Sequence, residues 1–450
     1  MTQLSRLLIG SFLLCGLKAS AQEPPLALVG ATVYPVSGPP IRLATIVIAD
    51  GRIVAVGATV SVPANARRID LRGATVIPGL VDARSSLFLS DSDLAGAGSA
   101  DQSVLDAADL FREEAGKVLA QGVTTLYLSP GSRGGVGGAG AVVKLHPPDA
   151  ARGEGWARVL RQRAALDLSL GISANGRSTS LERLNSYESL RSLFRGARQY
   201  GKSLVKYEQD LREFRTPPPA PKPAPGTAPN PAAPPQRPVK PRTNPAQENI
   251  LAALNGTLPV RIEAQRADDI LNALRLMDEF HVKAILLSAD ESGPLAGEIA
   301  RRGIPVIWGP TLAGPPRLDT RGHQPETAAI LAKSGVMVAL SPGSRTGLAS
   351  RFLRENAELA VAYGLASDRA LRAITLDAAK TLGVADRVGS IEVGKDADLV
   401  VLSASPMDRS AKVQRVFVDG REIAFPRPQV RQFRSNSKAV ISANGSRNGG

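Results

Sequence analysis

The sequence GATVIPGLVDARSS, residues 73–86, lies where the pattern of the chain changes. Before it, short β-branched runs alternate with turns, and Asp50-Gly51 joins two of these runs with the two-residue signal of a type I′ hairpin. The far end of the chain repeats this device, with strands predicted at 398–402 and 413–418 followed by a second Asp-Gly turn. The two ends are therefore predicted to meet in one small β-sandwich.

After this stretch, strands alternate with helices. An amphipathic helix is predicted at 267–280, where apolar residues recur at helical spacing. Strands are predicted at 123–128, 141–145, 259–264, 284–288, 305–308 and 336–341. Alternation of this kind is typical of parallel βα units, and at this length it favours a barrel. We therefore predict an α/β fold with a TIM-like (β/α)8 barrel at 79–387 and a composite β-sandwich from 22–78 and 388–426.

The charge of the chain is concentrated outside these domains. The 450 residues carry 55 Lys and Arg against 41 Asp and Glu, a formal net charge of +14. A proline-rich insertion at 214–247 and a tail predicted to be disordered at 427–450 are basic and contain no acid. Without these two segments and the first 21 residues, the rest of the chain has a net charge of about +2. This distribution favours weak contact with anionic envelope surfaces over a specific nucleic-acid groove.

The first 21 residues read as a signal peptide. Arg6 precedes an apolar core at 7–17, and Ala19-Ser20-Ala21 supplies a cleavage site. Leu14 stands before Cys15, where lipid attachment needs a small residue, so no lipid anchor is expected. We expect an exported protein, periplasmic or secreted. Its mature chain would have neither a disulfide nor a thiolate metal site.

Three segments resemble the amidohydrolase superfamily. Gly73–Ala83 resembles the start of its barrel, and Gly389–Val401 resembles the return of its chain to the sandwich. Arg266-Ala267-Asp268-Asp269-Ile270 resembles the secreted bacterial imidazolonepropionase-like branch. The resemblance implies the barrel and sandwich predicted above. It also implies metal-dependent hydrolysis of C–N bonds, other than linear peptide bonds in many members, with one or two divalent metals such as zinc.

The positions that the resemblance assigns to metal ligands hold other residues. The family has His-x-His after the first strand, its branch has a second His-x-His, and a His and an Asp follow on later strands. Here these positions are Arg84, Ser86, Glu263, Gln265, Ser288 and Pro342. Arg84 would place a permanent cation where a divalent metal should bind. We therefore expect no bound metal cofactor and no catalytic residue of the family type.

Few other residues could rebuild a site. Lys144, His146 and His323 are the candidates for substrate contact, because each is expected near the carboxyl ends of barrel strands, where barrel enzymes bind their substrates. His281 is expected at the opposite face. An alternative is an oxygen-coordinated Mg²⁺ or Ca²⁺ formed by Glu263 with Asp290 or Glu291.

A glycine-rich segment at 131–140 carries no phosphate-binding signature. The residue pattern that follows it predicts a strand, whereas a phosphate cradle needs a helix there. We interpret this segment as a loop over the mouth of the barrel.

The leading hypothesis is an exported amidohydrolase-fold protein that has lost its metal site and acts in binding or assembly, on an unknown small molecule or a paralogous subunit. One alternative is an active amidohydrolase with an atypical metal site. Another is a non-catalytic partner subunit of an active paralogue, in a homo- or hetero-oligomer.

Overall fold

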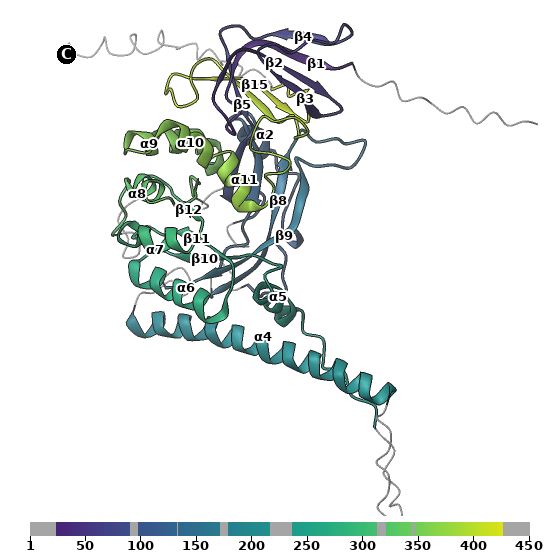
Figure 1. The fold of residues 1–450 in the computed structure, drawn as a ribbon, viewed down its shortest axis with the longest axis vertical. Helices are drawn as coiled ribbons and strands as arrows, with labels where there is room; N and C mark the ends of the chain where they lie inside the picture. Colours follow the sequence, from purple (N-terminus) through teal and green to yellow (C-terminus); the bar gives the residue numbers. More distant parts are fainter. Residues whose placement is uncertain are drawn as a thin grey trace, which may run out of the picture.

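A computed structural model describes residues 24–90, 98–132, 134–171, 179–216, 236–312, 321–343 and 347–425. The predicted signal peptide and the basic tail at 427–450 lie outside these residues, as does most of the proline-rich insertion. Figure 1 shows a β-sheet from the two ends of the chain at the top, the barrel below it, and one long helix along the bottom edge.

The terminal sheet joins strands from both ends of the chain. Its order is β16-β15-β14-β5-β1-β2-β3, with β4 paired to β1. The strands are β1 (Leu26–Val33), β2 (Ile41–Ala49), β3 (Arg52–Gly57), β4 (Arg67–Asp70), β5 (Thr75–Pro78), β14 (Leu399–Leu402), β15 (Val413–Val418) and β16 (Arg421–Glu422). Both Asp-Gly turns are confirmed. Asp50 and Gly51 have φ of 50° and 76°, and Asp419 and Gly420 have φ of 46° and 72°, as a type I′ turn requires.

The second sheet is the nearly closed barrel. Its order, from β13 to β6, follows the sequence in reverse without interruption. The strands are β6 (Leu80–Ser85), β7 (Val123–Leu128), β8 (Val136–Leu145), β9 (Ala157–Ser169), β10 (Val260–Ala264), β11 (Ala284–Ser288), β12 (Val306–Trp308) and β13 (Val338–Leu340). At the seam, the Ser341 hydroxyl donates a 3.0 Å hydrogen bond to the Arg84 carbonyl. The predicted α/β barrel beside a sheet from both termini is confirmed.

Helices cover the outside of the barrel, and one of them closes its amino end. They are α2 (Glu114–Leu119), α4 (Ser180–Arg215), α5 (Pro245–Leu254), α6 (Ala267–Phe280), α7 (Ala296–Arg301), α8 (Thr327–Lys333), α9 (Leu353–Ala362), α10 (Ser367–Ala373) and α11 (Leu376–Leu382), with 3-10 turns η1 (Val104–Asp106), η2 (Gly293–Leu295) and η3 (Gly347–Phe352). The predicted helix at 267–280 is confirmed as α6. No helix within the described ranges is both long and apolar enough to cross a membrane.

The barrel interior is a separate apolar core. Side chains from seven of the eight strands meet there, and α11 closes it with Ala378, Ala379 and Leu382. A larger core lies between the strands and the surrounding helices, and a third lies in the terminal sheet. The apolar plug leaves polar chemistry to the carboxyl end of the barrel.

The direction of β8 differs from the prediction. This strand pairs antiparallel with both β7 and β9, whereas the other neighbouring barrel strands are parallel. The glycine-rich segment that we interpreted as a loop supplies the first half of β8. Gly140 is required there, because a Cβ would lie 2.2 Å from the Tyr127 hydroxyl. The insertion is also narrower than predicted, because α4 extends to Arg215 and α5 begins at Pro245.

Candidate functional site

Three of the positions that the resemblance assigns to metal ligands come together at the carboxyl end of the barrel. Arg84 of β6 places Nη2 2.8 Å from Glu263 Oε1 of β10, and Nη1 2.9 Å from the Ser288 hydroxyl of β11. Ser288 also donates a 3.1 Å hydrogen bond to Glu263 Oε1. The backbone of Ser288 is left-handed, with φ of 66°, at the point where β11 ends. The three side chains therefore form a closed triplet around a guanidinium.

The triplet is held as an ion pair in a nearly buried position. The side chains of Arg84 and Glu263 are 15% and 12% exposed. Burial lowers the pKa of Arg84, but the charge of Glu263 outweighs it and the net shift is upward. Burial raises the pKa of Glu263, but Arg84 outweighs it and the net shift is downward. Each partner keeps the other charged.

A second polar layer lies in the same end of the barrel. The Arg261 guanidinium lies 3.6 Å from the centre of the Tyr127 ring, and its Nε is 3.5 Å from Asp167 Oδ1. Tyr127 and Ser129 donate hydrogen bonds of 2.8 and 2.6 Å to the two carboxylate oxygens of Asp167. Burial raises the pKa of Asp167, and it raises that of Tyr127 well above its ordinary range. This fully buried network fills space that a substrate would need.

Asp82 lies next to the triplet on β6. Its Oδ1 accepts a 3.0 Å hydrogen bond from the Arg84 backbone N–H, and Oδ2 has no partner among the described residues. Burial raises its pKa to about 6.

These residues do not fit a divalent metal. Within the described ranges, no group of three His, Cys, Asp or Glu side chains is placed to hold one. The Gln265 side-chain oxygen is buried and has no partner among the described residues, and Pro342 offers no donor. Asp290 and Glu291, which we considered with Glu263 for Mg²⁺ or Ca²⁺, bind His323 and the Ala267 backbone N–H instead. A cationic guanidinium at the centre repels any further cation.

His323 lies at this end of the barrel. Its Nδ1 is 2.7 Å from Asp290 Oδ1, and its Nε2 is 3.0 Å from the Thr311 carbonyl. The ring stacks on Trp308, with 5.4 Å between centroids and 10° between planes. Burial lowers the pKa of His323, but the hydrogen bonds to Asp290 and Thr311 outweigh it and the net shift is upward. Since both ring nitrogens face acceptors, this site stabilises the imidazolium form.

The contribution of His323 to stability is expected to fall as the pH rises. Because its folded pKa is raised, the stabilisation is complete below the ordinary histidine pKa of about 6.5 and is lost as the pH rises through the folded value. We expect His323→Gln to lower the free energy of unfolding more at about pH 5.5 than at about pH 9. Urea unfolding at both pH values measures this. The control is His281→Asn at the exposed left-handed end of α6, and equal losses for His323→Gln at both pH values would contradict the expectation.

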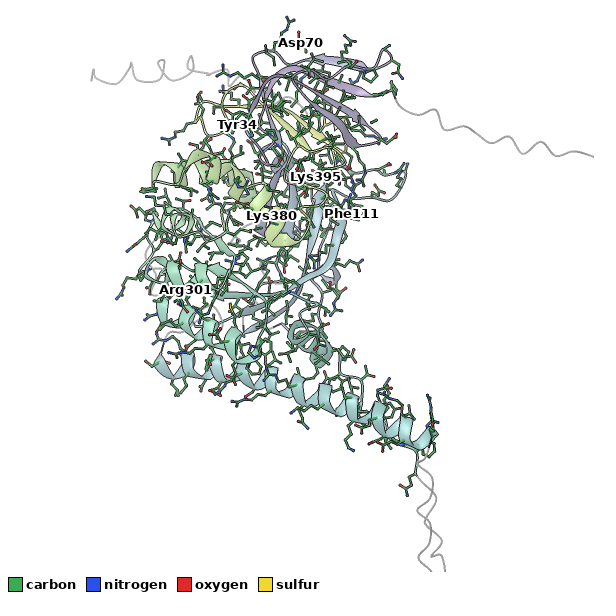
Figure 2. The ribbon with its side chains drawn as sticks, viewed as in Figure 1. Tyr34, Asp70, Phe111, Arg301, Lys380 and Lys395 are labelled. Atoms are coloured by element: carbon green, nitrogen blue, oxygen red, sulfur yellow. The ribbon has the colours of Figure 1, made fainter. Side chains whose placement is uncertain are left out.

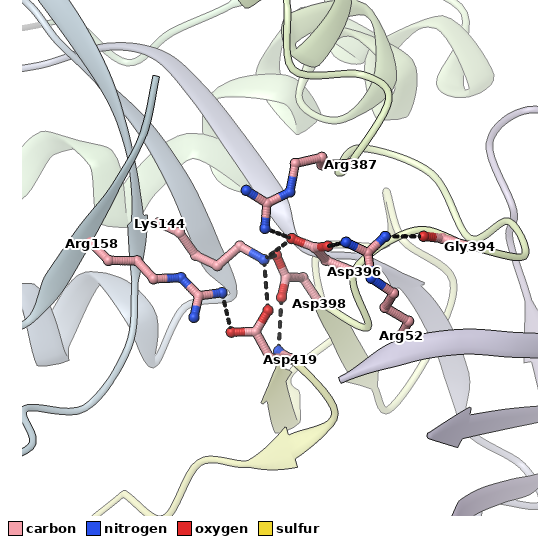
Figure 3. A network of polar contacts seen from close by, with 8 residues as sticks. All are labelled: Arg52, Lys144, Arg158, Arg387, Gly394, Asp396, Asp398 and Asp419. Carbon is pink, nitrogen blue, oxygen red and sulfur yellow. Dashed lines mark hydrogen bonds and ion pairs between the residues drawn. The ribbon is translucent and has the colours of Figure 1, made fainter. Parts of the chain in front are cut away.

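The expected placement of Lys144 and His146 at this end is wrong, because β8 runs antiparallel and carries both residues to the opposite end. Lys144 is fully buried there, with Nζ 2.5, 2.8 and 2.9 Å from carboxylate oxygens of Asp396, Asp398 and Asp419 (Figure 3). His146 Nδ1 contacts the Pro147 carbonyl at 2.7 Å. Neither residue can meet a substrate at the carboxyl end.

Arginines surround the three aspartates of this junction. Arg387 binds Asp396 at 2.7 Å, and Arg158 of β9 pairs with Asp419 (Figure 3). Burial raises the pKa of Asp398, whereas the net shift for Asp396 is downward because Lys144 and Arg387 outweigh its burial. Lys144 thus binds β8 to the terminal sheet by buried charge, and Arg158 adds a more exposed ion pair from β9.

Tyr127, Asp167 and Arg261 were not predicted as site residues from the sequence. Asp167 lies on β9, for which no strand was predicted, because the first half of β9 carries exposed and half-exposed Arg and Gln side chains. Arg261 lies within a strand that was predicted, two residues before Glu263 and hence on the same face of β10. That spacing is the signal by which Arg261 could have been found.

Two sequence comparisons match parts of this chain to amidohydrolases. Residues 319–423 match the amidohydrolase family. The chain is 41% identical over 58 residues to amidohydrolase tasK of Hapsidospora irregularis, a match that spans 13% of this chain and 6% of that protein.

The solved structures extend the similarity to the whole fold. An amidohydrolase from Thermotoga maritima MSB8 is 28% identical with a TM-score of 0.74, over 89% of this chain and all of that one. A prolidase complexed with N-methylphosphonate-L-proline is 18% identical with a TM-score of 0.53, over 89% and 100% of the two chains. Molinate hydrolase is 18% identical with a TM-score of 0.52, over 91% and 99%. The last two carry information on the fold alone.

Proposed function

This chain has the amidohydrolase fold, and residues 319–423 match the family in sequence. From this premise we propose that it is an exported member that no longer catalyses metal-dependent hydrolysis. In this proposal it is a pseudoenzyme that acts by binding or assembly. The amino-terminal segment supports export through its basic start, its apolar core and its Ala-Ser-Ala site. Fold alone does not carry the activity, because function resides in the side chains of the site.

The observation that carries the proposal is the Arg84 triplet. A metal-dependent hydrolase needs neutral imidazoles and carboxylates around an open coordination position. Arg84 instead directs both terminal nitrogens at Glu263 and Ser288, two other positions where the resemblance expects ligands. Since arginine stays protonated at any physiological pH, proton loss cannot free these oxygens for a metal.

The buried layer beneath the triplet supports the same conclusion. Arg261, Asp167 and Tyr127 are linked by an ion pair, a cation–π contact and a hydrogen bond, and all three are at most 1% exposed. This network keeps its charged and hydroxyl groups buried, away from solvent.

Elemental analysis of the purified, zinc-supplemented full chain tests the proposal. We expect substoichiometric zinc, manganese and iron, and no turnover of dipeptides or lactams above a buffer blank. A metal-loaded amidohydrolase purified and assayed in parallel is the positive control. Stoichiometric metal together with turnover that a chelator abolishes would overturn the proposal and favour the alternative of an atypical metal site.

A further inference from the structure

The end of α4 projects from the rest of the molecule. The buried residues of this helix are Ser186, Leu190, Phe194 and Ala197, all in its first half. The contacts with α5 continue to Tyr200, whose hydroxyl donates a 3.1 Å hydrogen bond to Glu248, and to Gly201 beside Leu251. Beyond this point the helix extends past the barrel, with its side chains clear of the barrel and the terminal sheet (Figures 1 and 2).

The projecting segments form a basic arm, defined here as residues 202–216 of α4 and its end together with residues 236–243, which lead back to α5. The arm has seven basic and three acidic residues, a net charge of +4. All seven basic side chains are on exposed residues: Lys202, Lys206, Arg212, Arg215, Arg237, Lys240 and Arg242. In contrast, the predicted ordered domains as a whole are nearly neutral. The arm is therefore a concentrated positive surface on a nearly neutral body.

The three acids of the arm lie on its helix and offset part of its positive charge. Asp210 pairs with Lys206 at 3.2 Å, one turn away on the same helix, and Glu213 accepts a hydrogen bond from Gln209. Such i,i+4 pairs at exposed positions contribute about 0.3–0.5 kcal/mol and are exchanged readily for other partners. Residues 236–243 contain three cations and no acid.

Apolar side chains stand among these cations. Val205 is 67% exposed and Val239 is 90% exposed. Exposed valines beside lysines and arginines match a surface that has anionic groups on the outside and an apolar layer below them. A nucleic-acid backbone offers the charge without an apolar layer.

We propose that the basic arm docks this protein on the surface of an anionic phospholipid bilayer. Lys and Arg contribute about 1 kcal/mol each close to such a surface, and their stems lie along its apolar boundary while their charges stay in water. This inference does not depend on whether the barrel site is catalytic.

Vesicle co-sedimentation of the full chain tests the arm. The arm variant neutralises four cations with Lys206→Gln, Arg212→Gln, Lys240→Gln and Arg242→Gln. The control variant neutralises four exposed cations elsewhere with Arg42→Gln, Arg68→Gln, Arg409→Gln and Lys412→Gln, so both proteins lose the same net charge. Circular dichroism verifies that both variants fold. The vesicles are phosphatidylcholine alone, or an equal mixture of phosphatidylcholine and phosphatidylglycerol.

We expect wild type and the control variant to bind the mixed vesicles alike, and the arm variant to bind at least about tenfold more weakly. Binding of the wild type should be lost between about 50 mM and 500 mM NaCl, since salt screens exposed charges. Equal weakening by the two variants would mean that net charge alone matters, and it would overturn the proposal. So would binding to neutral vesicles, or tighter binding to duplex DNA than to the mixed vesicles.

Discussion

Replacing Lys144 with methionine is expected to lower the free energy of unfolding by about 3–5 kcal/mol, because it leaves buried Asp398 without a cation and removes one cation from Asp396 and Asp419. Nζ of Lys144 is within 2.9 Å of three carboxylates, those of Asp396, Asp398 and Asp419. Burial lowers the pKa of Lys144, but these carboxylates outweigh it and the net shift is upward, so the group is an ammonium. Methionine keeps most of the length of the side chain and removes the terminal ammonium with its charge and donors.

Urea unfolding of the full chain measures this loss. The matched control is Lys412→Met on the exposed surface, expected within about 0.5 kcal/mol of wild type. Adding Asp398→Asn to Lys144→Met removes one of the stranded charges and should recover part of the loss. A loss below about 1 kcal/mol for Lys144→Met would show that the junction contributes little.

The second large effect is expected at the triplet. Arg84→Met should lower the free energy of unfolding by about 3–5 kcal/mol, because Glu263 is left charged and nearly buried without its partner. The double variant Arg84→Met with Glu263→Gln removes both charges, and it should be more stable than the single variant by about 2 kcal/mol or more. Ser288 can still donate its hydrogen bond to the glutamine carbonyl.

A full mutant cycle separates this ion pair from simple packing. Glu263→Gln alone should also be costly, since Arg84 then remains buried without an anion. Measured coupling between the two positions near zero would contradict a paired site. Bound zinc in the Arg84→Met variant, absent from wild type, would show that Arg84 was the element that excluded the metal.

The sequence predicts most strands because their signals are local. Each Asp-Gly turn fixes a hairpin, and β7, β11 and α6 begin and end at the predicted residues. The direction of β8 could not be predicted in this way, because direction depends on which neighbour a strand meets. β9 was not predicted, because its exposed half extends beyond the barrel core and is rich in arginine.

The site could be predicted in position but not in chemistry. The resemblance placed Arg84, Glu263 and Ser288 at matching strand ends, and the structure brings them together. That they bind one another depends on the left-handed backbone of Ser288 and on side-chain directions, for which the sequence carries no signal. Lys144 is the opposite case: the direction predicted for β8 was wrong, so Lys144 was expected at the wrong end of the barrel.

The composite sheet sets an order on the folding of this chain. Near the centre of the sheet, β5 pairs with β14, and Pro78 lies opposite Leu399. This pairing cannot form until more than three hundred residues after β5 have been synthesised. A chain released before β14 leaves β5 with an open edge, and open edges recruit strands from other chains. Loop closure over such a separation is slow, and the amino-terminal strands are exposed to aggregation until the last tenth of the protein arrives. A chaperone that holds the early strands would therefore improve the yield of the full chain.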